Sequence, residues 1–178
     1  MEHKIGEEKI LKRATLVFLR SIECGLPQTL LARKTRNIGM DMWNGYGGGI
    51  GDDEPLYNAA VRELFEEASV LAQPEDLQPI AVIDIANQMQ GGAFFTVRVY
   101  VFELWDWQGV ARESEEMAEP TWFLDNALPF QQMMPADRVW LPVALSGKKL
   151  LVRASYTPHQ RALIGEVTME FIDKLPEV

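Results

Sequence analysis

Apolar residues recur along the chain with two periods, one typical of strands and one typical of helices. Apolar, β-rich runs predict strands at 14–20, 28–34, 79–86, 93–104 and 121–124. The third and fourth runs flank a short, glycine-containing gap and therefore predict a hairpin. Helical patterns cover 57–68 and 137–146, and the run 161–175 fits either a helix or a strand. This uneven alternation predicts an α/β fold with a mixed sheet and helices packed on its faces.

The length and the lack of repeats or linkers predict a single domain spanning residues 1–178. Residues 1–12 are an N-terminal extension, for which a mobile tail and an extra edge strand both remain open. No apolar run is long enough to cross a bilayer, and the charged N-terminus does not resemble a signal peptide. We therefore expect a soluble, cytoplasmic protein without a membrane partner, as a monomer or a homodimer.

The charge of the chain limits its partners. A formal net charge of −9 argues against binding to a nucleic-acid polymer, which requires a basic face. The single cysteine, Cys24, excludes an intramolecular disulfide and a cysteine-based zinc site. An acidic protein can still bind a small phosphate compound when divalent cations lie between the two.

The predicted helix at 57–68 has an apolar face and an acidic face. Val61, Leu64, Phe65 and Ala68 recur at i, i+3, i+4 and i+7, which predicts a buried stripe. Pro55 suits the first turn of this helix, and Asp52 or Asp53 is expected to cap it.

Three carboxylates, Glu63, Glu66 and Glu67, follow the same spacing on another face, with only Arg62 to offset their repulsion. Such crowding is typical of a site for a hard cation such as Mg²⁺. The alternative is an ordinary charged face turned to solvent.

Glycines precede this helix at positions 45, 47, 48 and 49. A backbone without Cβ atoms can approach a ligand or metal closely, and a carbonyl of this loop could complete the shell of a cation. Taken alone, the glycines also fit a tight turn.

This segment resembles the signature of the Nudix hydrolases, G-x5-E-x7-R-E-U-x-E-E-x-G-U, in which U is a bulky aliphatic residue. The matching residues are Gly48, Glu54, Arg62, Glu63, Leu64, Glu66, Glu67 and Val70. One position departs, because Ser69 replaces the last glycine, which normally adopts a left-handed conformation after the helix.

Other stretches resemble the oxidised-purine nucleoside triphosphatases, the animal homologues of MutT. They are "WNGYGG" at 43–48, "ESEEM" at 113–117, "WF" at 122–123, "LPF" at 128–130 and "MMPADRVWLP" at 133–142. The resemblance runs from about Thr15 to the C-terminus. It implies a Nudix α/β/α sandwich that hydrolyses an oxidised purine nucleoside triphosphate, such as 8-oxo-dGTP, to the monophosphate and pyrophosphate. Such a reaction sanitises the nucleotide pool and so supports DNA repair.

The same resemblance implies roles for individual residues. Glu63 and Glu67 would be the principal Mg²⁺ ligands, with Mn²⁺ as a substitute, and Glu66 and the carbonyl of Gly47 would assist. Glu116 would reach the metal from the opposite side. Arg62 would orient the glutamates. Several carboxylates remain candidates for the general base.

A second group of residues is expected to bind the base. The amide of Asn44 offers a donor and an acceptor suited to a purine edge, although Asn before Gly is also a common turn residue. In the family, two adjacent aspartates read the rest of the edge, whereas here Ala136 precedes Asp137, and Met134 replaces an aromatic ring. Thr15, Ile38 and Lys34 match pocket positions more loosely, and Lys34 could meet a phosphate.

The loss of one aspartate suggests a narrower substrate range. A lone, ionised Asp137 accepts hydrogen bonds and suits the N1–H of an oxidised guanine, whereas an adenine-type edge requires a protonated acid. Asp137 also fits the N-cap of the following helix.

Two further functions remain open. One is Nudix chemistry on another substrate, such as a nucleotide sugar or a methylated purine nucleotide. The other is a non-catalytic module that binds a nucleotide, which the intact set of glutamates disfavours.

Overall fold

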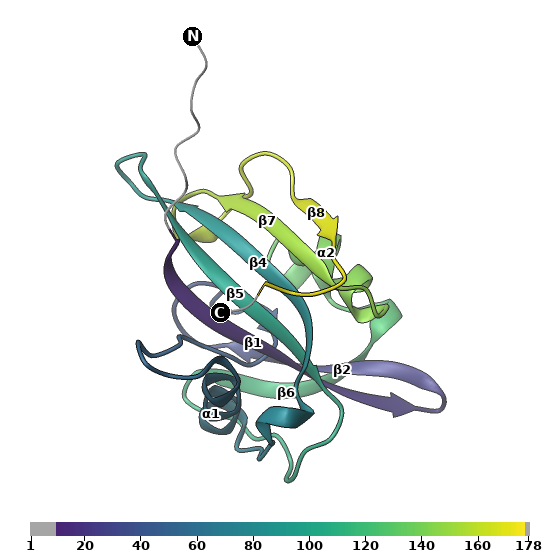
Figure 1. Ribbon diagram of the computed structural model, residues 1–178. Helices are drawn as coiled ribbons and strands as arrows, with labels where there is room; N and C mark the ends of the chain where they lie inside the picture. Colours follow the sequence, from purple (N-terminus) through teal and green to yellow (C-terminus); the bar gives the residue numbers. More distant parts are fainter. Residues whose placement is uncertain (1–9, 177–178) are drawn as a thin grey trace.

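The computed structural model describes residues 10–176, which form a mixed sheet with one helix on each face (Figure 1). The strands are β1 (Ile10–Glu23), β2 (Leu26–Lys34), β3 (Trp43–Asn44), β4 (Gln78–Gln88), β5 (Phe94–Leu104), β6 (Met117–Leu124), β7 (Leu150–Tyr156) and β8 (Thr168–Phe171). The α-helices are α1 (Leu56–Ala68) and α2 (Asp137–Leu145). The 3₁₀ turns are η1 (Pro74–Asp76), η2 (Asp125–Ala127), η3 (Phe130–Gln132) and η4 (Pro158–Gln160).

The sheet has the strand order β3-β2-β1-β5-β4-β7-β8, and β6 pairs with β2 outside this path. The β1–β5 and β4–β7 pairs are parallel, and all other pairs are antiparallel. The predicted hairpin is confirmed, because Gln88 at the end of β4 pairs with Phe94 at the start of β5. Strands from both ends of the chain therefore lie beside one central hairpin.

Alternation along β1 divides the core into two layers. Val17 and Leu19 pack with Leu64 of α1, whereas Phe18, on the other side of the sheet, packs with Trp140 of α2. Successive side chains of a strand point to opposite faces, so one strand serves both cores. The result is the predicted α/β/α sandwich.

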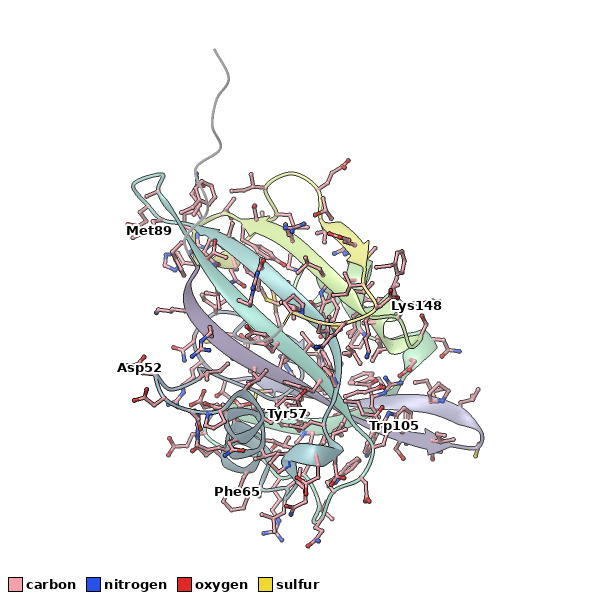
Figure 2. The ribbon with its side chains drawn as sticks, in the orientation of Figure 1. Asp52, Tyr57, Phe65, Met89, Trp105 and Lys148 are labelled. Carbon is pink, nitrogen blue, oxygen red and sulfur yellow. The ribbon has the colours of Figure 1, made fainter. Side chains whose placement is uncertain are left out.

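The predicted strands and both helices are present, but the prediction of which α1 residues are buried was partly wrong. Phe65 is 52% exposed, and Figure 2 shows it pointing away from the sheet. Leu64 and Ala68 are fully buried as predicted, and Ala59 and Ala60 are buried in place of Phe65, because alanine lets the helix backbone approach the sheet closely. The capping prediction was also wrong, since Pro55 occupies the N-cap and no side chain caps the helix.

The structure answers part of what the sequence left open at the two ends of the chain. Residues 10–12 belong to β1 and pair with β5 in the sheet, so they form neither a tail nor an extra edge strand. Residues 1–9 of the predicted extension lie outside the described residues. Of the run 161–175, residues 168–171 form β8, which pairs with β7. Between residues 10 and 176, no helix has the length and apolar character needed to cross a membrane.

The last glycine position of the sequence signature keeps the expected left-handed turn, although serine occupies it. Ser69 adopts φ 59° and ψ 26°, in the left-handed region, and its N–H donates to the Phe65 carbonyl. A side chain in this conformation costs about 1–2 kcal/mol relative to the right-handed helix.

We expect Ser69→Gly to stabilise the protein by about 0.5–1 kcal/mol, because glycine avoids this cost and returns part of it as unfolded-chain entropy. Urea unfolding should show a higher midpoint with an unchanged slope. Ser146→Gly is the matched control, since Ser146 follows α2 with φ −78° and gains nothing from glycine. Equal midpoints for wild type and Ser69→Gly would contradict this account.

Candidate active site

The glycine segment lies directly against β1. The Val17 N–H donates to the Tyr46 carbonyl at 2.6 Å, and the Thr15 N–H donates to the Gly48 carbonyl at 2.8 Å. A Cβ on Gly47 would stand 2.1 Å from the Thr15 carbonyl oxygen, so no larger residue fits there. This close approach fixes the position of the glycine loop, which lies between a cluster of carboxylates and a pocket.

Glu67 is the buried carboxylate of the site, with 5% of its surface exposed. Its Oε2 accepts the Gly47 N–H at 2.8 Å. Burial raises the pKa of Glu67 to about 7, and the charges of Glu116 and Glu63 raise it further, against the Gly47 N–H and Lys34. Glu67 is therefore not part of a solvated helix face.

Arg62 holds the remaining acidic groups together. Its Nε and Nη2 donate to the two carboxylate oxygens of Glu54 at 2.7 and 2.8 Å. Its Nη1 donates to Glu63 Oε1 at 2.8 Å and to Glu66 Oε2 at 3.3 Å. The bonds from Arg62 to Glu54, with that from the Gly51 N–H, lower the pKa of Glu54 to about 2. The guanidinium thus fixes the orientation of three carboxylates.

Glu63 occupies the space that a side chain on Gly48 would need. A Cβ on Gly48 would lie 2.5 Å from Glu63 Oε2. The glycine therefore allows the carboxylate to lie against the loop. Glu66, by contrast, is more exposed to solvent than Glu63.

Glu116 comes from the loop before β6. Its carboxylate forms an ion pair with Arg36, and its carbonyl accepts the Thr35 N–H at 2.9 Å. Its charge contributes to the raised pKa of Glu67, so the two groups are electrostatic neighbours. The structure thus brings Glu63, Glu67 and Glu116 together from distant parts of the sequence.

The donors at this site fit a hard cation. Among residues 10–176, no three acidic, histidine or cysteine side chains already have metal-binding geometry. The donor set is nevertheless all oxygen, as Mg²⁺ prefers. The Gly47 carbonyl accepts no hydrogen bond from any described residue, while the carbonyls of Tyr46 and Gly48 do. A divalent cation would compensate the buried charge of Glu67, with Glu63, Glu116 and the Gly47 carbonyl as further ligands.

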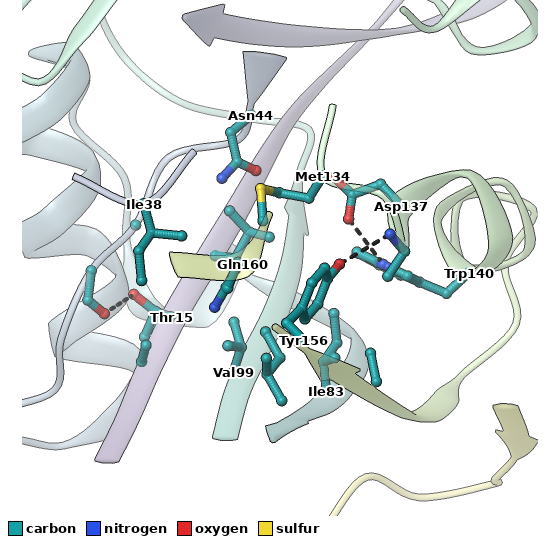
Figure 3. A pocket seen from close by; sticks show the side chains of 17 residues that line it. Thr15, Ile38, Asn44, Ile83, Val99, Met134, Asp137, Trp140, Tyr156 and Gln160 are labelled. Carbon is teal, nitrogen blue, oxygen red and sulfur yellow. Dashed lines mark hydrogen bonds between the residues drawn. The ribbon is translucent and has the colours of Figure 1, made fainter. Parts of the chain in front are cut away.

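A pocket of about 180 Å³ lies on the other side of the glycine segment (Figure 3). Its wall is mostly apolar, with a few polar groups that converge on the interior, as in typical small-molecule sites. It is lined by Ala14, Thr15, Leu16, Ile38, Asn44, Gly47, Gly48, Ile83, Ile85, Val99, Met134, Ala136, Asp137, Trp140, Ala154, Tyr156 and Gln160. Gly47 and Gly48 therefore separate the pocket from the carboxylates.

The two polar residues predicted to read a base are both in this pocket. The Oδ1 of Asn44 accepts the Gly45 N–H at 2.9 Å, which leaves its Nδ2 hydrogens for a ligand. Asp137 is buried, and its Oδ1 accepts the Trp140 Nε1–H at 3.1 Å. Burial raises the pKa of Asp137 to about 7.

Two expectations about Asp137 were wrong. It is the first residue of α2 rather than its N-cap, a position held by Ala136 without a side-chain bond. It is also not a purely ionised group near neutral pH, because desolvation alone raises its pKa without a neighbouring carboxylate.

The remaining predicted residues divide between the two halves of the site. Thr15, Ile38 and Met134 line the pocket as expected. Lys34 does not line it, and its charge instead lowers the pKa of Glu67 on the carboxylate side.

Sequence reasoning missed part of the pocket wall. Ile83, Ile85 and Val99 were predicted only as strand residues, and alternation along their strands gave no sign of which face would hold a ligand. Tyr156 ends β7 and Gln160 ends the turn η4 that follows, where no motif marks them. The Gln160 Nε2 donates to Asn87 Oδ1 at 2.7 Å, which fixes this side chain beside the pocket.

A family model described as NUDIX domain matches residues 11–144. The chain therefore belongs to the NUDIX family and is a Nudix hydrolase. Enzymes of this family generally use divalent metal ions.

Individual relatives agree with this assignment. The oxidized purine nucleoside triphosphate hydrolase of Danio rerio is 33% identical over 132 residues, which cover 74% of this chain and 81% of that protein. The protein of the same name from Mus musculus is 33% identical over 122 residues, which cover 68% of this chain and 74% of that protein. The crystal structure of a MutT protein from Bacillus halodurans has a TM-score of 0.69 at 19% identity, covering 90% of this chain and 98% of that chain. This last likeness shows the fold.

We expect Gly48→Ala to weaken metal binding, because the new methyl group displaces the Glu63 carboxylate. The concentration of divalent cation at half-maximal activity should rise about tenfold or more. Gly49→Ala is the matched control, since a Cβ there meets no atom within 4 Å. Identical cation titrations for the two variants would show that the position of Glu63 is unimportant.

Proposed function

We propose that this enzyme hydrolyses oxidised purine nucleoside triphosphates, 8-oxo-dGTP among them, to the monophosphate and pyrophosphate in a Mg²⁺-dependent reaction that sanitises the nucleotide pool. One observation carries the proposal: a largely apolar pocket with polar groups at its end shares the Gly47–Gly48 backbone with the carboxylate cluster. The names of the two vertebrate relatives support the same substrate class.

The arrangement divides the work between two sides of one loop. A base in the pocket directs its phosphates toward Glu63, Glu67 and Glu116, with Lys34 nearby as a cationic partner. Glu63, Glu67, Glu116 and the Gly47 carbonyl would hold Mg²⁺ there, and the ion would neutralise phosphate oxygens and lower the pKa of the attacking water. Arg62 keeps the carboxylates oriented, and one carboxylate of the cluster takes the proton from that water.

A second substrate class fits one feature of the pocket. Ile38, Met134 and Gln160 line both the pocket and an adjacent open groove. A base with a bulkier substituent, such as a methylated purine, or a nucleotide sugar, could extend into that groove. The buried Glu67, held beside two further carboxylates, disfavours a module that only binds nucleotide.

Pyrophosphate release tests the proposal directly. With Mg²⁺, we expect kcat/KM for 8-oxo-dGTP to exceed that for dGTP at least tenfold, and Glu67→Gln to lower it by about 10²-fold or more. Glu75→Gln, which changes an exposed carboxylate of η1, is the matched control and should retain activity. Equal rates with both nucleotides would refute the sanitising role while keeping the chemistry.

The raised pKa of Asp137 predicts a pH-dependent choice of base. Above pH 7 the ionised carboxylate accepts from the N1–H of 8-oxoguanine, and below pH 7 the protonated acid can donate to the bare N1 of 8-oxoadenine. The ratio of kcat/KM for 8-oxo-dGTP to that for 8-oxo-dATP should therefore rise about tenfold or more from pH 6 to pH 8.

Both substrates use the same carboxylate cluster, so titration of that cluster cancels in the ratio. Asp137→Asn should make the ratio independent of pH. A ratio that keeps its pH dependence in this variant would assign the titration to another group.

A further inference from the structure

Tyr156 is a buried tyrosine at the inner end of the pocket that the proposed chemistry leaves without a role. It is the last residue of β7 and lies opposite Asn87 of β4 in the parallel pair. Only 2% of its surface is exposed. Figure 3 shows its hydroxyl directed toward the end of the pocket where Asp137 and Trp140 lie.

The hydroxyl of Tyr156 has one hydrogen-bond function satisfied and one free. Its oxygen accepts the Ala136 N–H at 3.0 Å. No described residue accepts its proton. Burial raises the pKa of Tyr156 to about 12, so the group keeps that proton at neutral pH. A buried donor without an acceptor is costly, and a ligand in the pocket can supply the missing partner.

The neighbours of this hydroxyl define the chemistry of the ligand. The charge of Asp137 contributes to the raised pKa of Tyr156, so the two groups lie close together. The Trp140 N–H is already donated to Asp137 Oδ1, and Ala136 has no polar side chain. The inner end therefore presents one acceptor, the Asp137 carboxylate, beside one donor, the Tyr156 hydroxyl.

We propose that Tyr156 is a specificity-determining residue that donates its hydroxyl proton to the carbonyl oxygen at position 6 of a 6-oxopurine base. In such a base the neighbouring N1–H faces Asp137, so one O=C–N–H edge satisfies both groups. This inference rests on the proposed function and narrows its substrate class to guanine-type bases.

A 6-aminopurine does not match this pair. Its exocyclic amino group is a donor at the place where the Tyr156 proton needs an acceptor, and its N1 carries no proton for the carboxylate. The Tyr156 hydroxyl then stays unpaired in a buried pocket, which is the arrangement that discriminates most strongly between similar ligands.

The first test is Tyr156→Phe at pH 8, where Asp137 is ionised. The kcat/KM ratio of 8-oxo-dGTP over 8-oxo-dATP should fall roughly tenfold or more, because only the 6-oxo base loses a hydrogen bond. Tyr100→Phe is the matched control, since Tyr100 is a buried tyrosine of the same sheet that packs with α1 and should leave the ratio unchanged. An unchanged ratio in Tyr156→Phe overturns the inference.

The second test weakens the acceptor on the substrate itself. A 6-thio-8-oxo-dGTP, which keeps the N1–H but carries sulfur, a weaker acceptor, in place of the oxygen at position 6, should be used by wild type several-fold less well than 8-oxo-dGTP. Tyr156→Phe should show a smaller difference, because both changes act on the same hydrogen bond. Additive losses in this cycle overturn the inference.

Equilibrium binding of the monophosphates separates the two proposals. If wild type hydrolyses no triphosphate, yet binds 8-oxo-dGMP tighter than 8-oxo-dAMP in a way that Tyr156→Phe abolishes, the proposed function fails and the role of Tyr156 stands. If hydrolysis favours the oxidised base, but neither the kcat/KM ratio nor the ratio of binding affinities for the two bases depends on Tyr156, the proposed function stands and this inference fails.

Discussion

The close approach of Gly47 to the Thr15 carbonyl is the constraint on which the rest of the site depends. A Cβ on Gly47 would lie 2.1 Å from this oxygen, so only glycine fits there and only glycine lets the loop lie flat against β1. In that position the Gly47 N–H reaches Glu67 on one side, and the same backbone forms a wall of the pocket on the other. A shift of this loop would therefore move the pocket and the carboxylate cluster relative to each other.

The carboxylate cluster is organised at the expense of local stability. Arg62 offsets the charges of Glu54, Glu63 and Glu66, but it makes no hydrogen bond to Glu67. Glu67 remains a buried acid with a raised pKa, beside Glu63 and Glu116. Without a bound cation this arrangement opposes folding, which is typical of sites whose geometry serves binding rather than stability.

The sequence predicted the fold and the grouping of charged residues on α1, for identifiable reasons. Strand alternation and helical spacing are local signals, and the spacing of Arg62, Glu63, Glu66 and Glu67 places them on one helix regardless of tertiary context. The exposure of the side chains of α1 was less predictable. Phe65 fits an apolar stripe by spacing, but the small residues Ala59 and Ala60 decide which side of α1 packs on the sheet.

The base pocket was less predictable because it is assembled by pairing of distant strands. The pKa of Asp137 depends on its burial, which no sequence pattern reports, and Tyr156 reaches the pocket only because β7 pairs with β4 in parallel register. Motifs therefore identify the carboxylate cluster, whereas the groups that line the pocket follow from topology.

The parallel pairing of β4 with β7 also has a consequence for the order of assembly. The glycine loop, β1 and α1 all precede residue 70, whereas the inner wall of the pocket belongs to a strand that ends at residue 156. During synthesis the N-terminal part leaves the ribosome first. A nascent chain thus carries its carboxylate helix well before the pocket can close, and the pocket is the last part of the site to form.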